Sequence, residues 1–222
     1  PEADWTTMSQ RDLVPVRAGR FIIHTADHAD AVRIGDWAFR IEAGLAFGTG
    51  QHATTHGCMA AIARLKKIRD FQNIADIGTG TGVLAMAALQ ANRSARAIAS
   101  DIDPIAIDVA AENLALNHFV AGACAGRMAL AVCPGLAAPA LRNRAPYDLV
   151  LANILAPPLI ALARDMARVI APGGVLVMAG LLHHQQRAVA NAYRRHGLVP
   201  AWPMDRRAEW PCLVLTKKGV QA

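Results

Sequence analysis

A glycine-rich stretch, Asp76–Gly82 (DIGTGTG), limits what this chain can fold into more than any other segment. A short apolar run precedes it, and the apolar run 83–89 follows it. This order predicts a buried strand, a tight glycine turn and a helix. Glycines at alternate positions let the backbone bend sharply and approach a ligand that a Cβ would push away. The free N–H groups of the helix start point at the same place, so the stretch predicts a site for a nucleotide-like ligand.

Alternating strand, turn and helix patterns continue to the C-terminus and predict a Rossmann-like α/β fold. Such an alternation is typical of a mostly parallel sheet with helices on both faces, whose ligands bind at the carboxyl ends of the strands. No helix separates the last two strands, so the final strand is expected to be antiparallel. The seven predicted strands are 73–77, 96–100, 127–132, 147–152, 175–179, 198–203 and 212–216, and the helices among them include 103–117, 159–170 and 185–196.

The segment before the glycine stretch follows a different pattern. Gly35-Asp36 lies between two short alternating runs, 32–34 and 37–41, which predicts a β-hairpin. A second glycine-rich loop then leads into a helix that is expected to reach about Ile68. His52 and His56 in this helix have a spacing that zinc sites use, but Ala53 stands where the zincin pattern has Glu. No metal site is expected.

Composition limits the partners and the location of the chain. The net charge of +6 invites an anionic partner, but Lys and Arg come as dispersed pairs without a basic tract. An ordinary solvated surface without stable nucleic-acid binding is therefore expected. No apolar run reaches the ~18–20 residues of a membrane span, and no signal peptide is visible. Four scattered cysteines without a C-x-x-C pair favour reduced thiols in a cytoplasmic protein. The chain is also expected to be a monomer.

The glycine spacing favours one class of cofactor. A dinucleotide fingerprint, G-x-G-x-x-G/A, fits Gly78 and Gly80, but its third position falls on Val83. The loop carries no Lys that would neutralise a triphosphate. Asp101, at the end of the next strand, can accept hydrogen bonds from both ribose hydroxyls. A ligand with ribose and adenine but no phosphate fits best, and S-adenosylmethionine is such a molecule.

Several motifs resemble those of known methyltransferases. Asp76–Gly82 resembles motif one of the class I S-adenosylmethionine-dependent methyltransferases, and Asp101–Ile107 resembles their acidic motif after strand two. More specifically, the chain is similar to the PrmA family, the bacterial methyltransferases of ribosomal protein L11, through 44–55, 152–156, 172–174, 180–182 and 209–214. It departs from the family at Ala53, where Pro is usual, and at Gln51, where Thr is common. The family's N-terminal substrate-binding domain is expected to be missing before the linker-like segment 4–13.

This resemblance implies roles for particular residues. Thr55 would hydrogen-bond the methionine end of the cofactor, and Phe47 would cover the cofactor or serve as a core aromatic. Asn153 is the predicted catalytic residue, because its side-chain carbonyl and a neighbouring backbone carbonyl can orient an incoming amine. The alternative is a structural Asn that caps the turn before Pro157-Pro158. The implied cofactor contacts are Thr55, Gly78, Gly80, Asp101, Asn153 and Phe47.

The resemblance implies that the chain methylates amino groups of ribosomal protein L11, on lysine side chains, the N-terminal α-amine or both. A methyltransferase of the same fold acting on another protein, RNA or a small molecule is the alternative, and a cofactor-binding module without catalysis is a third. Residues 1–46 are predicted to form a linker helix and a short β segment. Residues 47–222 are predicted to form the S-adenosylmethionine-dependent methyltransferase domain.

Overall fold

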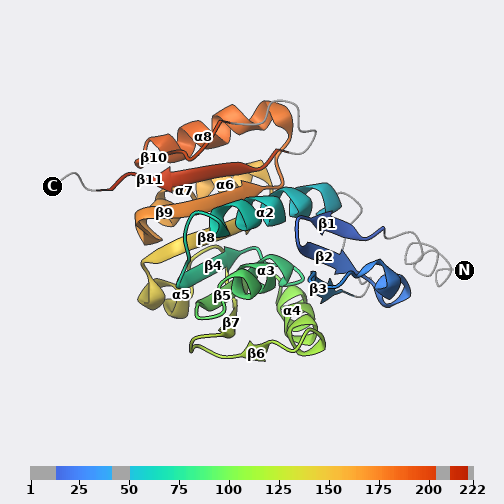
Figure 1. Cartoon of the computed structure of the whole chain (residues 1–222). Coiled ribbons are helices and arrows are strands. Elements are labelled where there is room, and N and C mark those ends of the chain that lie inside the picture. The colour runs from blue at the N-terminus through green and yellow to red at the C-terminus, as the bar shows by residue number, and fades with distance from the viewer. Residues whose placement is uncertain (1–13, 42–50, 204–210, 220–222) are drawn as a thin grey trace, which may run out of the picture.

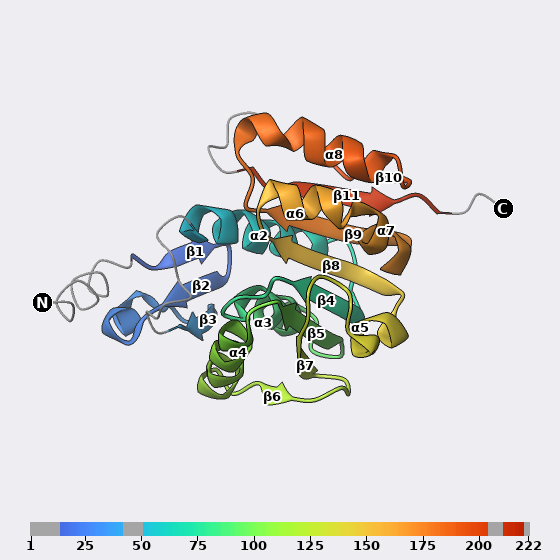
Figure 2. The ribbon, with the colours of Figure 1, turned by 180° about the vertical axis from the view of Figure 1, so that it is seen from behind.

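The computed structural model describes residues 14–41, 51–203 and 211–219 of the 222-residue chain. A large sheet forms its centre, and helices cover both faces of this sheet (Figures 1 and 2). The strand order is β10-β11-β9-β8-β4-β5-β7-β6. These strands are β4 (Asn73–Ile77), β5 (Arg96–Asp101), β6 (Val120–Ala121), β7 (Arg127–Val132), β8 (Tyr147–Asn153), β9 (Ile170–Ala179), β10 (Leu198–Pro200) and β11 (Leu213–Lys217).

Two hydrophobic clusters lie on opposite faces of this sheet because strand side chains alternate. In β4, Ile74 belongs to the cluster under the first set of helices, whereas Ala75 and Ile77 belong to the other. Both sets of side chains are buried, which explains the continuous apolar run in the sequence. The first face carries α2 (Gln51–Lys66), α3 (Val83–Ala91) and α4 (Pro104–Leu116). The second carries α5 (Pro139–Arg144), α6 (Ala156–Ala161), α7 (Ala163–Val169) and α8 (Gln186–Arg194) (Figure 2).

The predicted Rossmann-like fold is confirmed, with differences in detail. The reversed strand is β11, which pairs antiparallel with both β9 and β10. The two-residue β6 adds an edge strand, so the described sheet has eight strands instead of seven. The single helix predicted for 159–170 is two helices, α6 and α7. Helix α6 begins earlier, at Ala156, because Pro157 and Pro158 fit its first turn, where no N–H partner is needed.

The predicted hairpin around Gly35-Asp36 is wrong. Strand β3 (Trp37–Arg40) pairs in parallel with β2 (Phe21–His24), and β1 (Val16–Ala18) pairs antiparallel with β2. The chain crosses from β2 to β3 through the 3-10 helix η1 (Ala26–Ala31). The carboxylate of Asp36 accepts hydrogen bonds from the Arg17 guanidinium and from the N–H of Arg33, so this turn closes the crossover instead of a hairpin.

This small three-stranded sheet packs on the first face of the large sheet. Phe21 and Phe39 are buried in the same cluster as α2 and α3. The side chain of Asn117, after α4, accepts a hydrogen bond from the N–H of Arg40 at 2.7 Å and donates one to its carbonyl at 2.8 Å. The predicted boundary between residues 46 and 47 lies outside the described residues and stays a prediction. None of the helices within the described ranges is long and apolar enough to cross a membrane.

Candidate active site

A small cavity of about 50 Å³ lies at the carboxyl ends of β4 and β8. Helix α2 contributes Thr55, the glycine stretch contributes its loop and the start of α3, and β8 contributes Asn153. The fold thus brings four of the six predicted site residues to one place. The lining residues are Thr55, Gly78, Thr79, Gly80, Thr81, Val83, Leu84 and Asn153.

Gly78, Gly80 and Gly82 all have positive φ angles, of 72°, 53° and 79°. Their surroundings differ. A Cβ added at Gly80 would meet nothing within 4 Å, whereas a Cβ at Gly78 would overlap Cγ2 of Ile154. A Cβ at Gly82 would lie 3.2 Å from Cβ of Ala110 in α4. Gly80 therefore leaves space for a ligand. Gly78 and Gly82 instead leave space for protein side chains, those of Ile154 and Ala110.

This difference answers the question raised by the dinucleotide fingerprint. That fingerprint has a small residue at its third position for close packing of the helix, and Val83 stands there instead. In this fold Gly82, one residue earlier, lets α3 and α4 approach each other. The sequence could not show this, because Ala110 lies in another helix. The packing of Ile154 on Gly78 was likewise invisible in the sequence.

Asp101 lies beside the glycine loop at the end of β5, as predicted. One carboxylate oxygen accepts the N–H of Gly80 at 2.9 Å, and the other accepts the N–H of Asp103 at 3.1 Å. A carboxylate oxygen can accept two hydrogen bonds, so each keeps one acceptor position for a ligand hydroxyl. Asp103 caps α4 through the N–H of Ile105, which leaves Asp101 free of the capping role.

Asn153 ends β8 opposite Ala179 of β9 and is partly exposed to the cavity. No other residue in the described ranges hydrogen-bonds its side-chain amide, so this amide does not cap the turn before Pro157-Pro158 here. The next residue, Ile154, is held from two sides. Its side chain covers Gly78, and its carbonyl oxygen would lie 2.5 Å from a Cβ at Gly180.

A buried carboxylate, Asp76, lies beneath the loop, and sequence reasoning missed its role. Its side chain is 1% exposed, and one oxygen accepts the hydroxyl of Thr79 at 2.6 Å. The other oxygen has no hydrogen-bond partner within the described part of the chain. Burial raises the pKa of Asp76 to about 7, helped by the charge of Asp101 and opposed by the Thr79 bond and the nearby backbone N–H of Ala85. Its position at the head of the glycine stretch was the available signal.

The remaining predicted residues have different outcomes. Thr55 is buried at 3% exposure and lines the cavity, while Phe47 lies outside the described residues. His56 is exposed in α2. Across the described ranges, no group of three His, Cys, Asp or Glu side chains lies close enough to hold a metal ion.

The residues present fit a ligand with a ribose and without phosphates. The lining of the cavity contains no Lys or Arg among the described residues, and Asp101 offers two acceptors. The N–H of Gly80 bonds this carboxylate, and Gly80 and Asn153 line the same cavity.

Comparisons with known proteins identify the family of this chain. The sequence model of the family "Ribosomal protein L11 methyltransferase (PrmA)" matches residues 1–218. A protein of that name from Agrobacterium fabrum is 47% identical over 193 residues, which are 87% of this chain and 64% of the relative. A namesake from Bradyrhizobium diazoefficiens is also 47% identical, over 97% of this chain and 71% of the relative. The chain therefore spans about two thirds of the length of these relatives.

Solved structures show the same similarity. A ribosomal protein L11 methylase from Lactobacillus delbrueckii subsp. bulgaricus superposes with a TM-score of 0.76 at 26% identity, over 93% of this chain and 98% of that one. A precorrin-6y methyltransferase from Geobacter metallireducens, at 15% identity and a TM-score of 0.58, shares the fold alone. These matches show that the chain belongs to the ribosomal protein L11 methyltransferase (PrmA) family.

Proposed function

We propose that this chain transfers a methyl group from S-adenosylmethionine to amino groups of ribosomal protein L11. The observation that carries the proposal is the free amide of Asn153 beside the glycine loop, in a chain whose relatives bear that name. Bound S-adenosylmethionine would supply an activated methyl on a sulfonium. The residues of this chain hold that donor and orient the acceptor.

Four residues would hold the donor. Asp101 accepts the ribose hydroxyls at its two remaining acceptor positions, and the open backbone beside Gly80 approaches the methionine end. Gly78 contributes its backbone to the same loop, and the hydroxyl of Thr55, at the cavity wall, hydrogen-bonds the methionine carboxylate or amine. We also propose that Phe47 covers the bound donor.

Asn153 would act by positioning. Its side-chain oxygen and a neighbouring backbone carbonyl accept hydrogen bonds from the amine, which aims the nitrogen lone pair along the bond between sulfur and methyl. The amine must be neutral to attack. An α-amino group, with a reference pKa of ~7.7–8.0, is partly neutral at pH 7, whereas lysine at ~10.4 is not. Burial near a cationic sulfonium favours the neutral form of either, so no general base is assigned.

A second acceptor class has weaker support. Methylation of RNA or a small molecule on the same fold remains the alternative, because one fold carries many functions. Leu155 is 70% exposed and follows Ile154 at the end of β8. These aliphatic side chains suit the stem of a lysine better than the plane of a base, which favours a protein acceptor.

A transfer assay separates the possibilities. The chain is incubated with labelled S-adenosylmethionine and, in parallel, with a high concentration of free ribosomal protein L11, with ribosomal RNA, and with bulk lysate. We expect label in L11 amino groups, located by peptide mass spectrometry. Label in RNA alone would contradict the protein acceptor. Cofactor binding without transfer in any arm would support a binding module instead.

The proposal also covers the domain boundaries, the cellular location and the oligomeric state of the chain. We propose that residues 47–222 form the methyl-transferring unit, with 1–46 as linker and β segment, and that the chain is a cytoplasmic monomer. Light scattering after size exclusion tests the oligomeric state. A mass of about 47 kDa, twice the 23.6 kDa of one chain, would contradict the proposed monomer.

A further inference from the structure

Many exposed basic residues of this chain lie at or next to the starts of β4, β5, β7, β8, β9 and β10. In Figure 1 the parallel strands begin on the left side, away from the ends that lead toward the glycine loop. We call this surface the amino-end face. Its exposed basic residues are Lys67, Arg69, Arg93, Arg96, Arg127, Arg142, Arg168, Arg194, Arg195 and Lys218.

Contacts between distant segments bring these residues together. Arg96, the first residue of β5, hydrogen-bonds Asn73, and Asn73 in turn bonds the carbonyl of Arg144. Arg69 donates to the carbonyl of Asp148. At the other end of the sheet, the N–H of Lys218 bonds the carbonyl of Gly197, just after Arg194 and Arg195. Pairs that are dispersed in the sequence thus form one surface.

The acidic residues on this face are few, and each has a partner nearby. Asp70 pairs with Lys66, and Asp165 lies 3.7 Å from Arg168. The carboxylate of Asp148 accepts the N–H groups of Gln72 and Asn73. Within the described ranges, no other basic residue of this face forms an ion pair with a carboxylate.

Helix geometry explains only part of this charge. Basic side chains in the last turn of a helix stabilise it by interacting with its dipole, which accounts for Arg142, Arg168 and Arg194. Arg96 and Arg127 are instead the first residues of β5 and β7, and Lys218 follows β11. These positions have no helix end to stabilise, so helix dipoles do not account for their charge.

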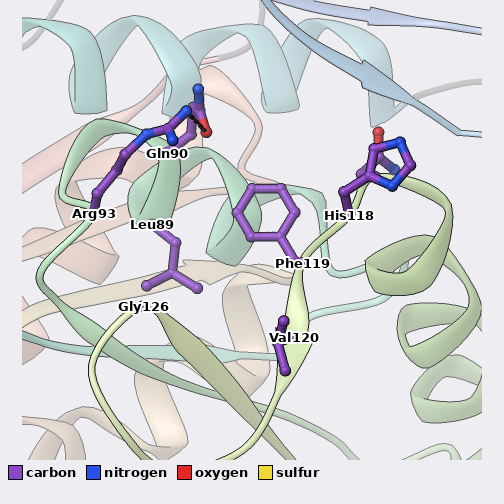
Figure 3. Close-up of a pocket in the computed structure, with 8 residues that line it drawn as sticks. Leu89, Gln90, Arg93, His118, Phe119, Val120 and Gly126 are labelled. Atoms are coloured by element: carbon purple, nitrogen blue, oxygen red, sulfur yellow. Dashed lines mark hydrogen bonds between the residues drawn. The ribbon is translucent and has the colours of Figure 1, made fainter.

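Two hollows border the same face. One, of about 330 Å³, is lined by Arg93, Gln90, His118 and Phe119. Figure 3 shows Arg93 bonded to Gln90 on one side, with the ring of Phe119 between Arg93 and His118. The other, of about 470 Å³, lies between α5 and α7, with Arg142 and Arg168 in its wall. Arginine beside an apolar or aromatic surface suits a base next to its phosphate.

In contrast to the expectation from the dispersed basic pairs in the sequence, we propose that the amino-end face binds the phosphate backbone of nucleic acid, independently of base sequence. The seven neighbouring strands from β10 to β7 are spaced by ~4.8 Å, so the amino-end face is about 30 Å wide. A face of this width can contact several successive phosphates of a nucleic-acid strand. Most of the charges are guanidinium groups, which bind phosphate in a bidentate manner. This surface lies at the opposite edge from Asn153, so both sites can be occupied together.

The test measures binding of a fluorescent 20-nucleotide RNA and of a DNA duplex of equal length, by anisotropy, between 50 and 200 mM salt. If about five phosphates are contacted, affinity for the duplex should fall by about 10²–10³-fold over that range. Arg127→Gln combined with Arg142→Gln should weaken binding at 50 mM salt about tenfold and lower the salt slope by about two.

A matched double variant, Arg33→Gln with Arg187→Gln, removes the same net charge elsewhere and should change affinity less than twofold. Equal loss in both variants would mean attraction by net charge alone and overturn the proposal. Absence of binding at 50 mM salt would overturn it too, as would clear preference for phosphatidylserine vesicles over both nucleic acids. Unchanged thermal unfolding and S-adenosylmethionine affinity confirm that both variants are folded.

Discussion

The two ends of the strands in the large sheet differ in almost every property. We call the side where the parallel strands end the carboxyl edge, and the amino-end face, where they begin, the amino edge. The carboxyl edge carries three glycines with positive φ and a buried carboxylate. The cavity there has no cationic lining residue in the described ranges. The amino edge carries exposed arginines and lysines, and each of its few carboxylates has a partner nearby.

Strand direction explains the contrast. In a parallel sheet each helix begins near the carboxyl edge and ends near the amino edge, so N–H groups meet at one edge and carbonyl groups at the other. The carboxyl edge can hold a ligand with backbone and a few carboxylates. The amino edge needs cations for its helix ends, and here it has more of them than the helices require. One edge suits a small ligand, and the other suits an extended anion.

The largest expected effect separates two glycines of the carboxyl edge. Gly78→Ala should cost about 2–5 kcal/mol of unfolding free energy, because the positive φ costs about 1–2 kcal/mol and the overlap with Ile154 about 1–3 more. Gly80→Ala should show only the φ cost yet weaken S-adenosylmethionine binding at least tenfold. Denaturant unfolding and calorimetric titration measure these two quantities.

Adding Ile154→Ala to Gly78→Ala should recover part of the lost stability. A double-mutant cycle without coupling would mean that Ile154 does not restrict Gly78.

Asp76 makes the stability of the carboxyl edge depend on pH. The pKa of Asp76 is about 7 in the folded protein and ~3.9 in the unfolded chain, so the folded state binds the proton more tightly. The stabilisation that results is fully present below about pH 4 and is lost as the pH rises through 7. This loss amounts to up to about 4 kcal/mol of unfolding free energy, and the Asp76→Asn variant should not show it. The measurement is the difference in unfolding free energy between wild type and variant from pH 4 to 8.

Asp165→Asn on the amino edge is the control, because this carboxylate is exposed and only weakly paired. Parallel pH profiles for wild type and Asp76→Asn would show that Asp76 is ionised in the folded protein throughout this range.

Asn153→Ala should lower kcat about 100-fold or more, about 3 kcal/mol, while S-adenosylmethionine affinity stays within about tenfold. The reason is that the amide orients the acceptor and makes few contacts with the donor. Asn143→Ala, an exposed amide on α5 at the amino edge, should change neither quantity by more than twofold. Loss of donor binding as large as the loss of kcat would assign Asn153 to the donor site alone.

The smallest effect belongs to Arg144, a partly buried arginine of the amino edge. Arg144 donates to the carbonyl of Ala97 at 2.9 Å and to that of Ala123 at 3.4 Å, and burial lowers its pKa. Arg144→Gln should therefore cost about 1–2 kcal/mol of unfolding free energy without affecting donor affinity. Arg142→Gln, whose side chain is exposed, should cost less than about 0.5 kcal/mol. Equal costs would contradict a structural role for Arg144.

Local patterns made most of the fold predictable. The strands at 73–77 and 127–132 were placed to the residue, because short apolar runs bounded by turn residues mark strands, of which 73–77 is buried and 127–132 is only partly buried. The start of α4 followed from Asp103 as cap and Pro104 as first helical residue. The hairpin at Gly35-Asp36 failed, because local alternation cannot show that β3 pairs in parallel with a strand before the crossover.

By itself, the sequence determined the strand-turn-helix of the glycine stretch, the acidic residue after the next strand and the class of fold, since all three depend on neighbours along the chain. The tertiary structure alone decided which glycine packs on Ile154, that Asp76 is buried with an unpartnered oxygen, and that dispersed basic pairs share one face. Those features depend on burial and on contacts between residues far apart in sequence, which no local pattern contains.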